Sequence, residues 1–241
     1  IALNTIMAET LKTFKKDVDA LIDKGDKKEI AIMHVIQKYI TESKKILFEG
    51  DNYSEEWHHE AERRGLPNVR TTPLALDAMV TDKGKHLFES NKVYTHSELE
   101  ARHEIELEKY IKKVQIEARV MGDLAINHIL PAALEYQNVL VTNIRGLKEA
   151  GLPESSYCSQ TKILQQISEH VQAVYTNVNE MVKQRKVANN MTDTRTKAIA
   201  YCTQVKEAYF DEIRYHADKL ETLVNDEKWT LPKYRELLFL R

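Results

Sequence analysis

Apolar residues recur every three to five positions through most of the chain, which is the spacing of an amphipathic α-helix. In the first fifty residues this pattern predicts one helix over about residues 3–23, stopped at Gly25, and a second helix ended by Gly50. No alternation with a period of two lasts long enough to indicate a strand. The sequence therefore predicts an all-α fold.

From residue 95 onward the predicted helices become much longer. Thr95 and Glu98 form a capping box that opens the longest of them. Pro131 should kink or break this helix, because proline lacks the amide proton that an interior position needs. The pattern then resumes as far as Gly151, and two more helices are expected over about residues 161–187 and 196–224. These lengths and the short polar turns between them predict a long antiparallel helical bundle.

The stretch between the two halves is irregular by comparison. Ser54 is expected to cap a short helix that ends at Gly65. Thr72 is expected to cap another, with Pro73 at its first helical position. Thr81 to Ser90 should add one turn or two. We expect four regions: two helices in 1–48, a connector in 49–94, the bundle in 95–226, and an apolar tail in 227–241 that docks on another surface.

The composition is typical of a helical protein with a solvent-exposed surface, and it argues against some classes of function. The 241 residues include only 7 Gly and 5 Pro, so the elements must be long. A formal net charge of −2 provides no general attraction to nucleic acid or to an anionic membrane, and no apolar run approaches the roughly 20 residues of a membrane span. Cys158 and Cys202 lack a CxxC spacing, which favours reduced thiols in a cytoplasmic protein and also permits a disulfide between them.

Several residue pairs have the spacing of metal ligands, but each pattern is incomplete. Glu100 and His103 share a helix face at the Glu-x-x-His spacing of di-iron bundles, which require a second copy on another long helix. The other copies lie on the short helix, at Glu55/His58 and Glu56/His59. His58 and Glu62 could also share a cation, although the HExxH pattern of zinc proteases is absent. We therefore predict exposed charged faces here, and neither a metal site nor a catalytic residue.

Other polar and aromatic residues are better explained by packing or by subunit contacts. Asp123 and His128, near Pro131, are expected to satisfy the carbonyls that the proline leaves free. Tryptophan and arginine are enriched at protein interfaces. The candidate interface residues are Trp57, His58, His59, Arg63, Arg64 and Trp229.

Three segments, in order, resemble parts of one enzyme family. Residues 50–77, GDNYSEEWHHEAERRGLPNVRTTPLALD, closely resemble the segment that follows the catalytic core of the type III glutamine synthetases. Residues 95–132 are similar to the long helix of that family's C-terminal domain. Residues 229–239, WTLPKYRELLF, resemble the family's terminus. The resemblance therefore spans the chain.

The resemblance implies a C-terminal portion without its active site. Such enzymes are bacterial, cytoplasmic double-ring dodecamers that make glutamine from glutamate, ammonia and ATP with Mg²⁺ or Mn²⁺. Their catalytic residues would precede residue 1, so the resemblance assigns no catalytic or cofactor-binding residue here. It implies that residues 1–48 close the catalytic domain, and that the remainder serves assembly or regulation. The alternatives are a free-standing helical module that binds a partner helix, and a metal-dependent bundle enzyme.

Overall fold

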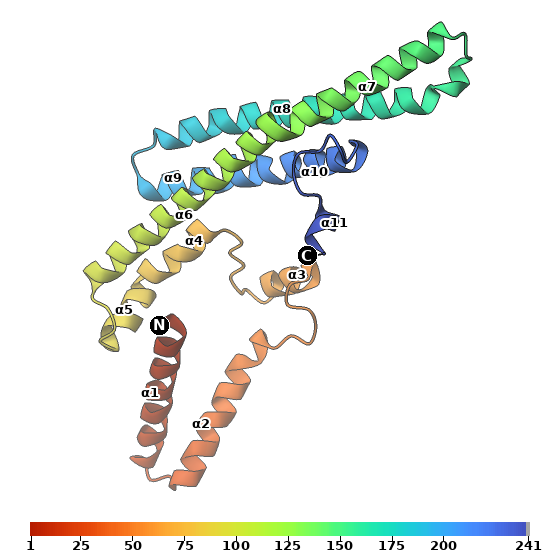
Figure 1. Ribbon diagram of the computed structural model, residues 1–241. Helices are drawn as coiled ribbons and strands as arrows, with labels where there is room; N and C mark the ends of the chain where they lie inside the picture. Colours follow the sequence, from red (N-terminus) through yellow and green to blue (C-terminus); the bar gives the residue numbers. More distant parts are fainter. Residues whose placement is uncertain (240–241) are drawn as a thin grey trace. The chain divides into compact units, whose positions relative to one another are not determined.

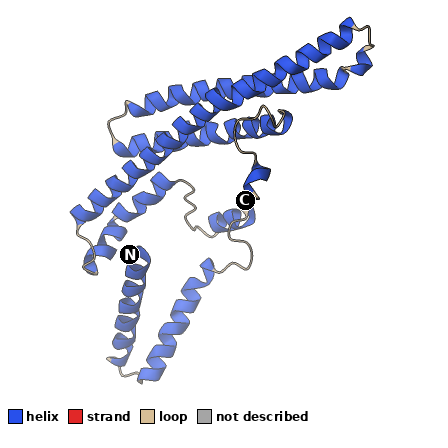
Figure 2. Ribbon diagram, in the orientation of Figure 1, coloured by secondary structure: helices blue, strands red, loops and turns tan. Residues whose placement is uncertain are grey.

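The computed structural model describes residues 1–239, and within that range it consists of helices joined by loops and turns and contains no strand (Figures 1 and 2). The predicted all-α class is confirmed. The chain divides into two compact units, one formed by residues 1–106 and the other beginning at Leu107. In the described part of the chain, no helix is both long enough and apolar enough to cross a membrane.

The first unit begins with a helical hairpin, α1 (Ala2–Ile22) and α2 (Lys28–Ser43). Gly25 makes the turn with φ +104°, a conformation that residues with a Cβ rarely adopt. A small apolar core joins the two helices: Val18, Ala31 and Val35, with Phe14, Leu21, Ile32 and Tyr39 packed against them. The helices predicted here from apolar spacing are therefore present.

The end of α2 differs from the sequence-based expectation. The helix stops at Ser43 and a 3-10 turn, η1 (Lys44–Ile46), follows it, so Gly50 is not its terminator. Leu47 is already extended. Phe48 packs against Trp57, with ring centroids 4.7 Å apart. The helix therefore ends before Gly50, and Phe48 instead packs against Trp57, nine positions further along the chain.

The connector contains α3 (Glu55–Arg63), α4 (Thr72–Leu76), the 3-10 turn η2 (Asp77–Val80) and α5 (Asp82–Ser90). Ser54 caps α3 as predicted, because its side chain accepts the Trp57 amide. Thr72, predicted as a cap, is instead the first helical residue, and the cap position belongs to Thr71. Helix α5 begins with a true cap, since the Thr81 hydroxyl accepts the Gly84 amide at 3.1 Å.

Helix α6 (His96–Leu124) starts at the predicted capping box. The Thr95 amide donates to Glu98 Oε2 at 2.8 Å, and the Glu98 amide donates to Thr95 Oγ1 at 3.4 Å. At its other end a π turn, η3 (Ala125–Ile129), leads directly into α7 (Leu130–Glu149). The helix is therefore not broken at Pro131. The Leu130 amide donates to Ala125 five residues back, and this wider turn relieves the clash that a proline ring makes with the preceding turn.

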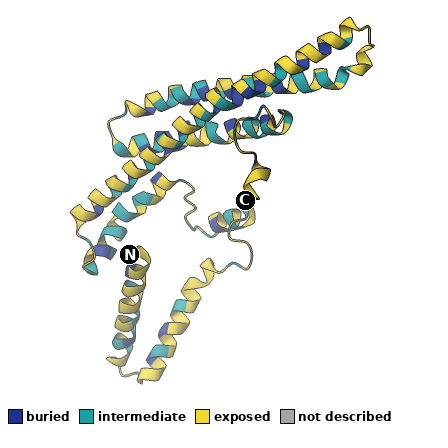
Figure 3. Ribbon diagram, in the orientation of Figure 1, coloured by how far each residue is buried: buried dark blue, intermediate teal, exposed yellow. Residues whose placement is uncertain are grey.

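The second unit is a bundle of long helices that begins at Leu107, within α6. A turn containing η4 (Glu154–Ser156) leads from α7 to α8 (Cys158–Asn189), which packs against both α7 and α10 (Ala208–Leu223). Helix α9 (Thr194–Ala200) joins α10 through a second π segment, η5 (Tyr201–Glu207). Figure 3 shows the buried positions on the facing sides of these helices. Fully or nearly fully buried side chains include Ile167, Val174, Met181, Tyr201, Ile213 and Leu220.

After α10 the chain turns back over the end of that helix and forms α11 (Tyr234–Leu237). Lys233 is buried, and its ammonium donates to the carbonyls of Glu221 at 2.7 Å and Val224 at 3.1 Å. It also pairs with Asp226 at 2.6 Å. A cation at the carboxyl end of a helix satisfies carbonyls that have no partner within the helix. The described part of the tail is thus tied to α10. The last two residues of the predicted tail region lie outside the described range.

Candidate functional site

The aromatic face of α3, predicted as an interface, is fixed by contacts within its own unit. Trp57 is half-buried against Phe48, and the Arg64 guanidinium lies 5.8 Å from the indole centroid. Arg64 also donates to the carbonyls of Leu47 at 2.5 Å and Lys45 at 3.2 Å. The indole and this arginine therefore hold α3 against the segment that follows α2.

Glu60 links both arginines of α3. Arg63 makes a two-point contact with its carboxylate, at 2.6 Å from each of two nitrogens, and Arg64 donates to Glu60 Oε1 from the next position. These hydrogen bonds, from Arg63 first and Arg64 second, lower the pKa of Glu60 to about 2. Both arginines are thus engaged with a carboxylate on their own helix.

The histidines of α3 are placed differently. His58 is half-buried and His59 is exposed. Tyr53, one residue before the helix cap, is 92% exposed and was not singled out from the sequence. No periodicity marks Tyr53, because it lies in the turn that precedes the helix. A partner-facing role for the α3 surface stays a prediction.

Trp229, the last predicted interface residue, lies in the tail of the second unit. It is half-buried, and the Lys233 ammonium lies 5.9 Å from its ring centroid. The indole nitrogen is buried and has no hydrogen-bond partner among the described residues. Ile129, Ala217 and Leu231 line a small pocket beside the ring, about 240 Å³ in volume. Trp229 thus packs within its own unit, and its proposed subunit contact stays a prediction.

The candidate metal ligands do not converge. Glu100 pairs with Lys85 at 2.8 Å, whereas His103 Nε2 contacts Asp77 Oδ1 at 3.0 Å. These contacts connect α6 to α5 and to η2. Across residues 1–239, no group of three or more His, Cys, Asp or Glu side chains is arranged to hold a metal ion.

The polar residues near Pro131 also have partners other than those expected. The Asn127 amide donates to Asp123 at 2.5 Å, and His128 Nδ1 lies 3.4 Å from the Thr230 hydroxyl of the tail. The expectation that Asp123 and His128 satisfy freed carbonyls is therefore wrong, because the π turn has already rearranged that backbone. Both cysteines are free thiols.

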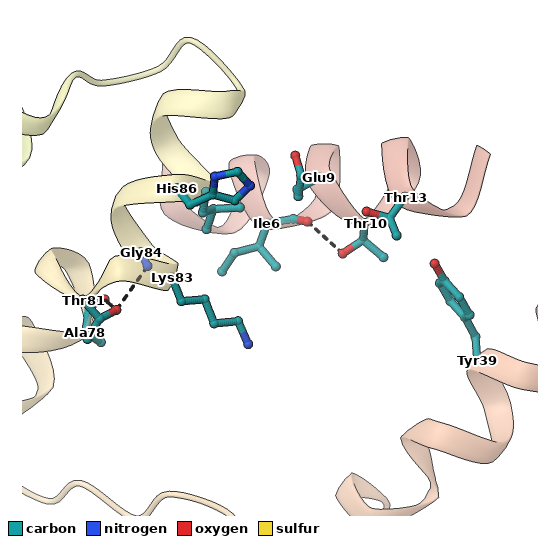
Figure 4. Close-up of a pocket in the computed structure, with 11 residues that line it drawn as sticks. Ile6, Glu9, Thr10, Thr13, Tyr39, Ala78, Thr81, Lys83, Gly84 and His86 are labelled. Atoms are coloured by element: carbon teal, nitrogen blue, oxygen red, sulfur yellow. Dashed lines mark hydrogen bonds between the residues drawn. The ribbon is translucent and has the colours of Figure 1, made fainter. Parts of the chain in front are cut away.

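A groove in the first unit has a volume of about 660 Å³. Figure 4 shows its two walls: Ile6, Glu9, Thr10 and Thr13 come from α1, and Ala78, Thr81, Lys83, Gly84 and His86 come from η2 and α5. Glu9 is already engaged, because the Asn91 amide donates to it at 2.7 Å and lowers the pKa of its carboxyl. The lining also contains His86, whose imidazole acts electrostatically on the Glu9 carboxyl, and no group of three metal-ligating side chains is found among the described residues.

Similarity to known proteins decides the family. Residues 31–148 match the family model described as the glutamine synthetase C-terminal domain. The chain carries a glutamine synthetase C-terminal domain. It is 44% identical, over its whole length, to a glutamine synthetase of Bacteroides fragilis, and 30% identical to the type-3 glutamine synthetase of Dictyostelium discoideum. The resemblance inferred from the sequence is confirmed. The chain spans about a third of the length of each of these relatives.

The glutamine synthetase C-terminal domain match starts within α2 and ends within α7. It contains the whole α3 surface with Trp57, Arg63 and Arg64. It does not contain α8, α10 or Trp229, which are covered by the similarity to the two relatives.

Proposed function

We propose that this chain is the C-terminal region of a type 3 glutamine synthetase and serves assembly of the enzyme. The observation that carries the proposal is the 44% identity over the whole chain to a glutamine synthetase about three times its length. The whole enzyme would join ammonia to glutamate with ATP and Mg²⁺ or Mn²⁺, in the cytoplasm, as a double-ring homo-oligomer. In this proposal the residues that bind nucleotide and metal lie elsewhere in the enzyme, and this chain alone is inactive.

The helical hairpin, which the resemblance assigns to the end of the catalytic domain, also carries an exposed apolar surface that supports contact with the rest of the enzyme and thus a role in its assembly. Leu3, Met7 and Leu11 lie at positions i, i+4 and i+8 of α1 and are 78%, 59% and 63% exposed. This spacing places them on one side of the helix. On α2, Met33 and Ile40 are also more than half exposed. An apolar stripe of this kind is characteristic of a surface that another protein surface covers.

The catalytic part of the proposal is tested by an activity assay. Purified chain, incubated with glutamate, ammonia, ATP and Mg²⁺ or Mn²⁺, should form no glutamine, whereas the whole enzyme should form it under the same conditions. Glutamine formation by the chain alone would refute the assignment of the chemistry to another part of the enzyme.

The assembly part is tested in the whole enzyme by sedimentation. The double variant Leu3→Glu/Leu11→Glu places two carboxylates on the apolar stripe of α1 and should shift the enzyme toward smaller species. The matched control is Lys16→Glu/Lys24→Glu, which changes two exposed residues of the same hairpin and should leave the assembly unchanged. Circular dichroism would confirm that both variants keep their helices. An unchanged sedimentation profile for the stripe variant would refute the role of this surface.

A further inference from the structure

Two arginines on neighbouring helices of the second unit have no carboxylate partner among the described residues. Arg119 belongs to α6 and Arg185 to α8, and neither guanidinium makes an ion pair or a hydrogen bond within residues 1–239. By contrast, Arg145, Arg214 and Arg235 of the same unit each pair with a carboxylate. The charges of Arg119 and Arg185 are therefore the ones that this part of the chain leaves without a counter-charge.

Contacts on either side of the two arginines place them next to each other. The Gln115 amide of α6 donates to Asn189 Oδ1 of α8 at 3.0 Å. Further along α6, a Cβ at Gly122 would lie 3.8 Å from the Met181 methyl group of α8. The two helices are thus antiparallel, and the arginines lie midway between these contacts, four residues after Gln115 and four before Asn189.

Residues four apart share one face of a helix. Both arginines therefore project from the side of the bundle that carries the hydrogen bond between Gln115 and Asn189. The axes of packed helices lie about 8–10 Å apart, so two long side chains on facing helices can reach a single small ion between them. Arg119 is exposed and Arg185 is half-buried, which leaves this place open to solvent.

The polar groups beside the arginines are also donors. Tyr201 is fully buried in η5, and its hydroxyl donates to Asn189 Oδ1 at 2.5 Å. That oxygen also accepts from Gln115, so both of its lone pairs are used. The Asn189 amide nitrogen has no acceptor within the described part of the chain. It can therefore donate to a bound anion.

The Tyr201 hydroxyl responds to both guanidiniums. Burial raises the pKa of Tyr201, and Arg185 and Arg119 both act in the opposite direction, because a nearby positive charge favours the phenolate. The two charges thus act on the same point at the surface between α6, α8 and η5, in agreement with the helix register.

The acidic side chains of these helix segments are engaged elsewhere. Asp123, one turn after Arg119, accepts from Asn127 at 2.5 Å. Glu180 pairs with Lys183 on its own helix at 2.5 Å. Glu117 lines a separate groove between α6 and α10. No described carboxylate therefore occupies the place between the two arginines.

Two guanidiniums with further donors beside them are suited to an oxyanion. Each guanidinium is planar and offers N–H groups in a fork that matches two oxygens of a phosphate or a carboxylate. Two arginines balance the double charge of a phosphate, whereas a carboxylate carries one charge. We propose that Arg119 and Arg185 form a binding site for a phosphate group, either the free ion or a phosphate monoester. The phosphate is bound without reaction, so the proposal does not rest on the ligase activity.

The test is an NMR titration of the full chain with sodium phosphate at pH 7.5 and constant ionic strength, since salt screens exposed charges. The guanidinium resonances of Arg119 and Arg185 should shift together and saturate. Arg119→Gln and Arg185→Gln should each weaken phosphate binding about tenfold or more, because each removes hydrogen bonds to a charged group. Arg119→Lys/Arg185→Lys keeps the charges and loses the forks, so it should also bind less tightly than the unchanged chain.

The matched control is Arg145→Gln/Lys162→Gln, which removes two exposed positive charges from α7 and α8 and leaves the same net charge as Arg119→Gln/Arg185→Gln. Phosphate should bind the control as tightly as the unchanged chain and raise the unfolding temperature of both. It should not raise that of Arg119→Gln/Arg185→Gln. Unchanged affinity in this arginine variant, or an equal loss in the control, would overturn the proposal.

Two further ligands define what the site accepts. Methyl phosphate binding at least as tightly as phosphate, with the same loss in the arginine variants, would assign the site to phosphate monoesters. Weaker binding of methyl phosphate would assign it to the free ion. Sodium acetate provides the carboxylate comparison, and acetate binding as tightly as phosphate would refute the preference for a phosphate group.

Discussion

Gly84 lies in α5, close to the backbone of the preceding 3-10 turn η2. Replacing Gly84 with alanine should lower the stability of this part of the first unit. A Cβ at this position would lie 2.5 Å from the Ala78 carbonyl oxygen and 2.7 Å from that of Met79. Both contacts are with backbone, so no side chain can rotate away. The dashed bond in Figure 4 shows that the Gly84 amide is simultaneously held by Thr81. The alanine methyl group can therefore enter only if η2 and α5 move apart.

Two opposing effects set the size of the change. Alanine in a helix is favoured over glycine by about 0.5–1 kcal/mol. Forcing an extra carbon into a closely packed place costs about 1–3 kcal/mol. We therefore expect Gly84→Ala to lower the free energy of unfolding of this region by about 1–2 kcal/mol, which corresponds to roughly 5- to 30-fold faster hydrogen exchange of α5.

Gly146 provides the matched control. It lies in α7, and a Cβ there would meet nothing within 4 Å. Gly146→Ala should therefore gain the helix preference alone and slow the exchange of α7 roughly 2- to 5-fold. Exchange measured by mass spectrometry reports each segment separately, so the two changes can be compared in one experiment. If Gly84→Ala slowed the exchange of α5 as Gly146→Ala slows that of α7, the reasoning from close backbone contact would be refuted.

One pH titration and two substitutions test other contacts. The pKa of the Glu60 carboxyl lies below its ordinary value of 4.5, so the ionised carboxylate stabilises the fold fully above about pH 4.5. This contribution to stability is lost as the pH falls toward about 2. An NMR titration of the Glu60 carboxyl with a midpoint near 4.5 would contradict its pairing with the arginines. Thr95→Ala removes half of the capping box of α6 and should cost about 1 kcal/mol in urea unfolding, whereas no loss would mean that water replaces the cap. Met181→Ala empties a fully buried position of α8 and should cost about 2–5 kcal/mol by the same method, with a loss below about 1 kcal/mol indicating that the core collapses around the gap.

Two helix starts were predictable because a single side chain determines each of them. Ser54 and Thr95 cap their helices in the structure because the decisive hydrogen bonds reach only three residues along the chain. The end of α2 was not predictable in this way, since it depends on Phe48 packing against Trp57. The two π segments were missed for another reason. Apolar spacings of three, four and five residues are all compatible with a helix, so a single added residue leaves no clear mark in the pattern.

The candidate sites show the same division between local and distant contacts. Glu60 lies three and four residues before Arg63 and Arg64, so the pairing of its carboxylate with both arginines could be predicted from helical spacing. The sequence-based prediction assigned both arginines to an interface instead. The hydrogen bond between Gln115 and Asn189, which aligns the two unpaired arginines of the bundle, joins residues 74 positions apart. No local spacing links them, because the register between α6 and α8 is set by the whole length of the bundle.

The π turn η3 makes the length of the chain at this point critical. Each residue advances an α-helix by about 100°. Deleting one residue between Ala125 and Ile129 would convert the wide turn to an ordinary one and rotate all of α7 by about that angle. Leu140 and Ile144, now buried, would be carried away from α8. Single-residue deletions should therefore be tolerated far less well here than in the turn between α7 and α8, although neither segment carries a proposed catalytic group.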